Sequence, residues 1–220
     1  MKLFSVLFFV CMLLPLASCS INKKDHVEMD IPLTEDLMRE HGILRRVLLM
    51  YEEIIGRVET NKPLPIDGAT QAVEIIKTFI QEYHEKLEED YIFPLVKTGE
   101  KVALVKTLLD QHNKGRKITA QLQTLLAKKT LDKKSKATIK KLMQQFITMY
   151  RPHAAREDTQ LFPLIRSLLS AKAFEKLGDK FEDLEHQLFG KHGFEDMEHK
   201  VTALEKELGI YRLEQFTPAT

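Results

Sequence analysis

Two segments of the chain contain the same arrangement of a histidine, a glutamate and a Phe-Pro-Leu sequence. Both read His-x3-Glu-x4-Phe-Pro-Leu followed by a β-branched residue, and they begin at His84 and His153. Residues four positions apart lie on one face of an α-helix, so Glu88 is expected beside His84 and Glu157 beside His153. Imidazole together with carboxylate is a ligand set suited to iron or zinc. One such pair has little specificity, whereas two copies in matching context predict a metal site.

A lone histidine precedes each copy, and its surroundings are also repeated. Glu40-His41 in the first half corresponds to Gln111-His112 in the second, and basic residues stand four and five positions after each histidine. The sequence therefore predicts two related helical hairpins, each with a lone histidine on its first helix and a His-x3-Glu pair on its second. The six candidate metal ligands are His41, His84, Glu88, His112, His153 and Glu157.

These six residues fall on otherwise apolar helical stripes, where an uncompensated carboxylate or imidazole is costly. Each would cost several kcal/mol to bury, and together they would exceed the net stability of a typical domain. Bound cations remove this problem. The set matches two metal ions, each with two histidines, bridged by the two carboxylates. Such a centre leaves open coordination positions for oxygen, nitric oxide, water or hydroxide.

The expected fold class is all-α: an up-down-up-down four-helix bundle over residues 33–169, with one or two short C-terminal helices over residues 170–220. Thr34 is expected to cap the first helix, and the segment from Asn61 to Gly68 to end it. The remaining helices are expected at about 70–97, 100–128, 136–165, 171–189 and 193–208. Pro152 lies inside the fourth, where we expect a kink and not a break.

The N-terminus has the layout of a secretory signal. Lys2 precedes an apolar run that is too short for a permanent membrane helix, and the run ends in Leu-Ala-Ser-Cys at Cys19. This resembles a bacterial lipobox, which implies a signal peptide at 1–18, a lipidated Cys19 and a tether at 19–32. The alternative is an ordinary signal peptide with a chance cysteine. We expect a lipid-anchored protein of the bacterial cell envelope that faces the periplasm, by analogy at the outer membrane.

The composition of the chain bears on which other partners it could bind. Lysine and arginine number 33 and aspartate and glutamate 32, with no clustered basic excess, so the sequence gives no indication of nucleic-acid binding. After cleavage before Cys19 the chain would have no thiol except the lipidated one, so its metal ligands would be nitrogen and oxygen. A protein partner is not indicated.

The ordered set of ligands and the Phe-Pro-Leu sequences resemble the hemerythrin-like, HHE cation-binding family over residues 33–190. This resemblance implies a four-helix bundle with a non-haem di-iron centre bridged by oxide or hydroxide. It implies that the four histidines are the nitrogen ligands, and that Glu88 and Glu157 are the bridging carboxylates.

The chain also departs from the oxygen-carrying members of that family. Arg116 stands where those carriers have a fifth histidine, and they place an aspartate five residues after the last histidine, which is Asp158 here. Whether Glu157 or Asp158 bridges is therefore open, although the internal repeat favours Glu157. The set is more like that of members associated with iron-sulfur cluster repair and nitric oxide response. Those members have an additional cysteine-containing domain, so we do not assign repair.

The expected function is binding of oxygen or nitric oxide for sensing, scavenging or delivery. A di-iron redox enzyme, peroxidase-like or nitric-oxide-reducing, and an iron or zinc storage and transfer protein are the alternatives; zinc or manganese could replace iron. Glu89 and Asp158 are expected in solvent or hydrogen-bonded to ligand imidazoles. Tyr83 and Tyr150 are expected to be packing residues, with a hydrogen bond from either to a metal-bound oxygen as the alternative. The remaining histidines, expected to be exposed or to surround the site, are His26, His186, His192 and His199.

Overall fold

The computed structural model describes residues 31–128 and 130–218, and every regular element in these ranges is helical. The bundle begins with α1 (Leu33–Glu59), and a continuous helical run follows through α2 (Ile66–Ile75), a π-helical segment (Ile76–His84), α3 (Glu85–Leu87), a second π-helical segment (Glu88–Ile92) and a 3-10 turn (Phe93–Leu95). Then come α4 (Lys101–Leu126) and a run formed by α5 (Lys133–Arg156), a π-helical segment (Glu157–Leu161) and α6 (Phe162–Leu168). The chain continues with α7 (Ala171–Phe189), α8 (Gly193–Leu208) and a 3-10 turn (Leu213–Phe216).

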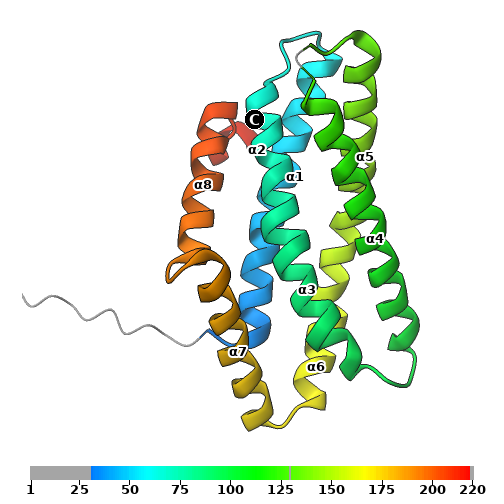
Figure 1. The fold of residues 1–220 in the computed structure, drawn as a ribbon, viewed down its shortest axis with the longest axis vertical. Helices are drawn as coiled ribbons and strands as arrows, with labels where there is room; N and C mark the ends of the chain where they lie inside the picture. Colours follow the sequence, from blue (N-terminus) through cyan, green and yellow to red (C-terminus); the bar gives the residue numbers. More distant parts are fainter. Residues whose placement is uncertain (1–30, 129, 219–220) are drawn as a thin grey trace, which may run out of the picture. The chain divides into compact units, whose positions relative to one another are not determined.

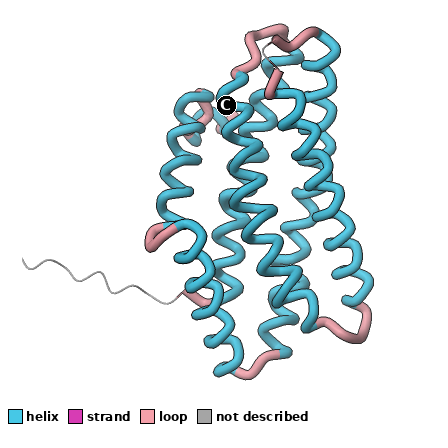
Figure 2. Tube along the Cα trace, viewed as in Figure 1, coloured by secondary structure: helices cyan, strands magenta, loops and turns pink. Residues whose placement is uncertain are grey.

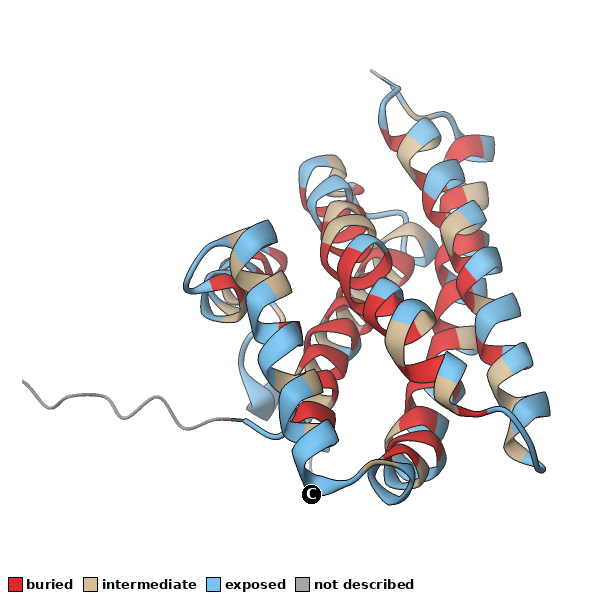
Figure 3. Ribbon diagram, turned by 60° about the horizontal axis from the view of Figure 1, so that its bottom comes forward, coloured by how far each residue is buried: buried red, intermediate tan, exposed pale blue. Residues whose placement is uncertain are grey.

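Four long helical runs, at residues 33–59, 66–95, 101–126 and 133–168, alternate in direction and form a bundle (Figures 1 and 2). Helix α1 packs on α5, α4 packs on α5, and α2 packs on both α1 and α4. Figure 3 colours the buried residues red, and they occur along all of these runs. The core includes Tyr51, Phe79, Phe146 and Ile147. The predicted all-α four-helix bundle with short C-terminal helices is thereby confirmed. The proposed signal peptide, Cys19, His26 and the tether up to residue 30 lie outside the described residues.

The C-terminal helices α7 and α8 pack against each other and against α1. Arg46 of α1 donates hydrogen bonds to Glu205 and to Thr202 of α8, both at 2.6 Å from Nη2. Phe181 of α7 is buried against the bundle. Within the described part of the chain, the apolar stretches of the helices are too short or too interrupted to cross a membrane.

Two expectations about helix ends were wrong. Pro32, and not Thr34, precedes the first helical residue, and Thr34 lies buried in the first turn without capping it. Gly68 does not end a helix, because α2 begins at Ile66 and contains it. A Cβ at position 68 would lie 3.1 Å from Leu208 Cδ2, so this glycine permits the close approach of α8 to α2. The break falls before it, where Asn61 has a positive φ of 55°.

The helix containing Pro152 continues through the proline, as expected, into a π-helical segment that starts at Glu157. The first half has the same feature, with a π-helical segment that starts at Glu88. Each segment is followed by the Phe-Pro dipeptide of its repeat, where proline has no N–H to donate. Short π-helical segments within helices are frequent at functional sites.

Gly115 of α4 allows Tyr150 of α5 to approach the helix backbone. A Cβ at position 115 would lie 2.0 Å from the Tyr150 hydroxyl, which donates a 2.5 Å hydrogen bond to Glu85 Oε1. We expect Gly115→Ala to lower the free energy of unfolding by about 1–3 kcal/mol, because the ring must move and its hydrogen bond must break. Urea denaturation measures this change.

The matched control is Gly56→Ala in α1, where an added Cβ would meet no atom within 4 Å. Alanine has the higher helix propensity, so this variant is expected to gain about 0.5–1 kcal/mol. Equal stabilities for the two variants would show that the Tyr150 contact does not constrain position 115.

Candidate metal centre

The six predicted ligand residues come together inside the bundle, one or two from each long helical run. His41 lies on α1, His112 on α4 and His153 on α5, and His84 is the last residue of a π-helical segment. Glu88 and Glu157 are each the first residue of a π-helical segment. All six side chains are at most 3% exposed. The π-helical turns begin at the two glutamates, so the repeat in sequence is also a repeat in local structure.

The four imidazoles form two pairs. Nε2 of His41 lies 3.0 Å from Nε2 of His84, and Nε2 of His112 lies 3.1 Å from Nε2 of His153. Two nitrogens bound to one ion at about 2.1 Å and at right angles would be separated by roughly this distance. Each pair therefore has the spacing of two neighbouring ligands on one cation.

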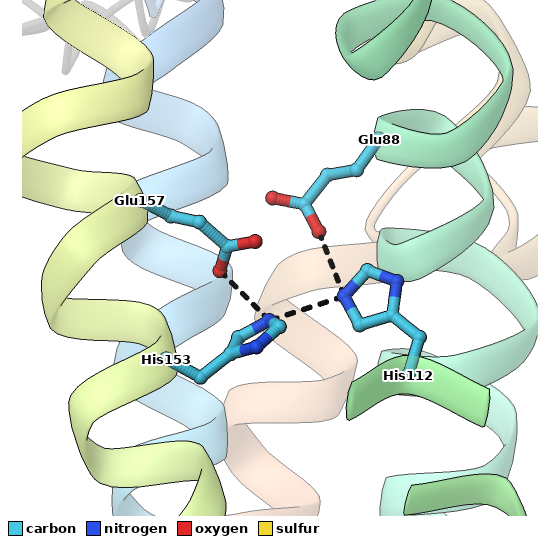
Figure 4. Close-up of side chains that lie close together, drawn as sticks. All are labelled: Glu88, His112, His153 and Glu157. Carbon is cyan, nitrogen blue, oxygen red and sulfur yellow. Dashed lines mark hydrogen bonds and ion pairs between the residues drawn. The ribbon is translucent and has the colours of Figure 1, made fainter. Parts of the chain in front are cut away.

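Each carboxylate spans the two pairs. Oε2 of Glu88 lies 3.6 Å from Nε2 of His84 and 3.5 Å from Nε2 of His112. Oε2 of Glu157 lies 3.4 Å from Nε2 of His41 and 3.1 Å from Nε2 of His153. Figure 4 shows one half of the arrangement, with both carboxylates directed toward the imidazoles of His112 and His153. Carboxylates in these positions can bridge two cations.

The carboxylate oxygens of this site have no other partner. Both oxygens of Glu88 and both of Glu157 are buried without a hydrogen bond. A buried charged group that lacks partners costs several kcal/mol, unless a cation compensates it. The groups Glu88, His112, His153, Glu157 and His41, His84, Glu88 each have ligand atoms within 4.8 Å of one another. The donor set fits a pair of metal ions.

The outer nitrogen of each lone histidine is held by the residue that follows a glutamate of the other hairpin. His41 Nδ1 donates to Asp158 at 2.6 Å, and His112 Nδ1 donates to Glu89 at 3.1 Å. A proton on Nδ1 leaves the Nε2 lone pair free to bind metal. The sequence-based choice between solvent and an imidazole partner for these two acids is thus settled in favour of the imidazoles. Glu157, not Asp158, faces the centre.

The other two imidazoles are held by the residues that precede the lone histidines. His84 Nδ1 donates to Glu40 Oε2 at 2.5 Å, and His153 Nδ1 donates to Gln111 Oε1 at 2.9 Å. No role for Glu40 or Gln111 was predicted from the sequence. A signal was present, since both stand at the same position of the repeat, but only the packing of the hairpins reveals which ring each one contacts.

Two arginines at equivalent positions of the repeat support the acids. Arg45 is hydrogen-bonded to Asp158, and Arg116 donates at 2.7 Å to Glu89 and also to the buried Glu85. Arg116 therefore faces the outer acids and not the centre, although it stands where oxygen carriers have a fifth histidine. The repeated phenylalanines also have matching roles: Phe162 stacks on His41 and Phe93 on His112, with ring centroids 5.6 and 5.5 Å apart.

The pKa values of the ligand side chains are shifted by burial and by the charges of neighbouring side chains. Burial lowers the pKa of His84 well below its ordinary value and that of His112 to about 4, which keeps both imidazoles neutral and able to bind metal. Burial also acts to lower the pKa of His41, but Asp158 and Glu157 raise it to about 9. Burial, and then the charge of Glu157, raise the pKa of Glu88 well above its ordinary value. A metal ion would favour the ionised carboxylate instead.

The remaining candidates are three histidines of the C-terminal helices and their connection, and two tyrosines of the bundle. His192 and His199 are exposed and His186 is partly exposed, as expected. Tyr83 and Tyr150 are buried in the core, and the ring of Tyr150 lies 5.2 Å from that of His153.

We expect Asp158→Asn to weaken metal binding about 10- to 100-fold, because the imidazole of His41 loses its anionic hydrogen-bond partner. Competition with a metal chelator measures this change. Asp90→Asn is the matched control, since the side chain of Asp90 is 51% exposed and pairs with Lys86. Equal affinities for the two variants would contradict the role given to Asp158.

Comparisons with known proteins agree with this geometry. The family model described as the hemerythrin HHE cation-binding domain matches residues 33–165. The chain is 42% identical over 196 residues to uncharacterized proteins of Mycobacterium tuberculosis (strain ATCC 25618 / H37Rv) and Mycobacterium bovis, in alignments that cover 87% of this chain and 77% of each relative. No solved structure matches the chain significantly.

Proposed function

Because this chain belongs to the hemerythrin HHE cation-binding domain family, we propose that its buried centre holds two iron ions and binds a diatomic ligand, oxygen or nitric oxide. The observation that carries the proposal is the set of four carboxylate oxygens that lack hydrogen bonds between two pairs of imidazoles. A site with this donor set requires cations, and its imidazole and carboxylate ligands suit iron.

In this proposal His41 and His84 would hold one ion, His112 and His153 would hold the other, and the carboxylates of Glu88 and Glu157 would be shared between them. Each ion then has about four protein ligands, which leaves room in a six-coordinate shell for a small molecule. A pair of ferrous ions supplies the electrons and the open positions that oxygen or nitric oxide requires.

The surrounding residues prepare the site for this role. The four outer hydrogen bonds orient the imidazoles, so that little rearrangement is needed on binding. The rings of Phe162 and Phe93 stack on His41 and His112 and place apolar surface against these two ligands. An apolar cover favours small neutral ligands over charged ones.

The optical spectrum of the purified, iron-loaded chain tests this function. We expect near-ultraviolet absorption that changes when oxygen, azide or nitric oxide is added. A colourless site that holds zinc would favour metal storage or transfer. Steady consumption of peroxide or nitric oxide with an electron donor would favour the redox enzyme over the ligand-binding protein.

We also propose that the protein is anchored in the bacterial cell envelope through a lipid on Cys19, with its bundle facing the periplasm. We expect Cys19→Ser to abolish incorporation of labelled fatty acid and to move the protein from the membrane fraction, because acyl chains supply the membrane affinity. Cys11→Ser, within the proposed signal peptide, is the control and should retain the label. Labelled Cys19→Ser protein would contradict the anchor.

A further inference from the structure

Three acidic side chains form a second cluster beside the centre. Asp36 and Glu40 of α1 and Glu185 of α7 each place an oxygen within 4.8 Å of the others. Glu40 is fully buried, and Asp36 is partly buried, with its side chain 19% exposed. One oxygen of Glu185 accepts a 2.9 Å hydrogen bond from the Phe194 N–H, which fixes this residue between α7 and α8. The cluster therefore reaches from the bundle interior to the surface.

One buried oxygen of this cluster has no hydrogen-bond partner. Glu40 Oε2 is held by His84, but Glu40 Oε1 is buried and unpaired. A buried carboxylate oxygen without a partner requires either a proton or a cation.

The charges around the cluster do not balance. Burial raises the pKa of Asp36 and of Glu185 to about 7, and repulsion by neighbouring acids adds to the effect. Arg39 donates to Asp36 at 3.3 Å, but it also pairs with Glu195 at 3.8 Å and lies over the ring of Phe194. One shared arginine leaves negative charge in a buried place.

We propose that Asp36, Glu40 and Glu185 bind a third divalent cation, of the hard class that prefers oxygen ligands, such as manganese or magnesium. Three carboxylates supply oxygen only, unlike the imidazole-rich centre, and they select this class. Asp36 is partly exposed, which gives the ion a path and leaves room for water ligands.

The third site is separate from the centre but connected to it by one side chain. Glu40 would bind the cation through Oε1, while Oε2 accepts the hydrogen bond from His84. Glu185 lies beyond residues 33–165, the segment that matches the family model, so α7 supplies a ligand from outside that segment. The site would exist whether or not iron occupies the centre.

Manganese titration of the full chain in detergent tests the proposal. Metal binding at the centre is first removed by Glu88→Gln and Glu157→Gln in one chain. The Mn²⁺ that this centre-disabled chain still binds then reports the third site. We expect about one Mn²⁺ per chain by electron paramagnetic resonance and metal analysis. Adding Glu185→Gln should weaken this binding at least tenfold, and Asp36→Asn should do the same.

Glu175→Gln, an exposed position on the same helix, is the control and should titrate like its parent. Circular dichroism confirms that each variant is folded. Absence of Mn²⁺ uptake by the centre-disabled chain would overturn the proposal, as would identical titrations with and without Glu185. Neither result bears on iron in the centre, which is measured separately by the iron content of the unmodified chain.

Discussion

Glu88→Gln is expected to abolish binding of the metal pair and, at the same time, to stabilise the metal-free protein. The amide cannot supply the negative charge that bridges two cations, so metal content should fall from about two ions per chain to near zero. Without metal, however, the wild-type carboxyl is buried beside Glu157, and its pKa is raised well above 4.5. An uncharged amide avoids this cost.

The sign of the pH dependence follows from the raised pKa. The unfolded chain releases the Glu88 proton near pH 4.5 while the folded metal-free chain retains it, so this group makes stability fall as pH rises above about 4.5. Glu88→Gln has no titrating group at this position, so its stability does not fall for this reason as pH rises. At neutral pH the metal-free variant should be more stable than metal-free wild type by on the order of 1–3 kcal/mol, measured by urea denaturation.

Glu82→Gln is the control, because Glu82 lies earlier in the same helical run with a side chain that is 58% exposed. It should retain both metal and wild-type stability. Normal metal content in Glu88→Gln would show that the Glu88 carboxylate is not a metal ligand. Lower stability of the metal-free variant at neutral pH would show that Glu88 has a stabilising partner within the protein.

Removal of metal from the wild-type chain is the second prediction with a large effect. Ligand binding stabilises a folded protein by RT ln(1 + [L]/Kd), which is about 4 kcal/mol at a thousandfold excess over Kd. A chelator should therefore lower the thermal midpoint by many degrees, and added ferrous iron under anaerobic conditions should restore it. Differential scanning calorimetry with and without chelator measures the shift.

The chelator should have little effect on Glu88→Gln, which is expected to hold no metal pair. A large chelator effect on that variant would locate the stabilising metal elsewhere, as at the cluster around Glu185. An unchanged midpoint in wild type would mean that the centre contributes nothing to folding.

The repeat of His-x3-Glu predicted which side chains meet in the bundle interior. Residues four apart on a helix share a face regardless of what packs against it, so His84 and Glu88, and His153 and Glu157, were expected as pairs. The internal repeat supplied the missing information about tertiary structure, since two similar hairpins that pack together must bring equivalent residues near a common axis. The structure brings all six residues together, with both acids spanning the imidazole pairs.

The contacts around the imidazoles could not be predicted to the same extent. Glu40 contacts His84, and Asp158 contacts His41 from the far hairpin. Such contacts depend on the rotation of one helix against another, which a pattern of apolar residues does not determine to within one side chain. The π-helical turns at Glu88 and Glu157 were also missed, because an extra residue in one turn hardly alters the apolar periodicity.

The close approach of two helix backbones was also not predicted from the sequence. Gly68 was interpreted as a helix breaker, yet it serves as a contact for α8 inside α2. The local sequence, with two prolines and an asparagine nearby, is the same in either case. Only the position of the distant helix α8 distinguishes them.

The central claim is that six buried side chains hold two iron ions, and the most direct test is metal analysis of the purified full chain beside a Glu88→Gln, Glu157→Gln double variant. We predict about two irons per wild-type chain and loss of both in the variant, whose fold is retained by circular dichroism. Equal iron in the two proteins, or none in wild type reconstituted anaerobically with ferrous iron, would contradict the assignment.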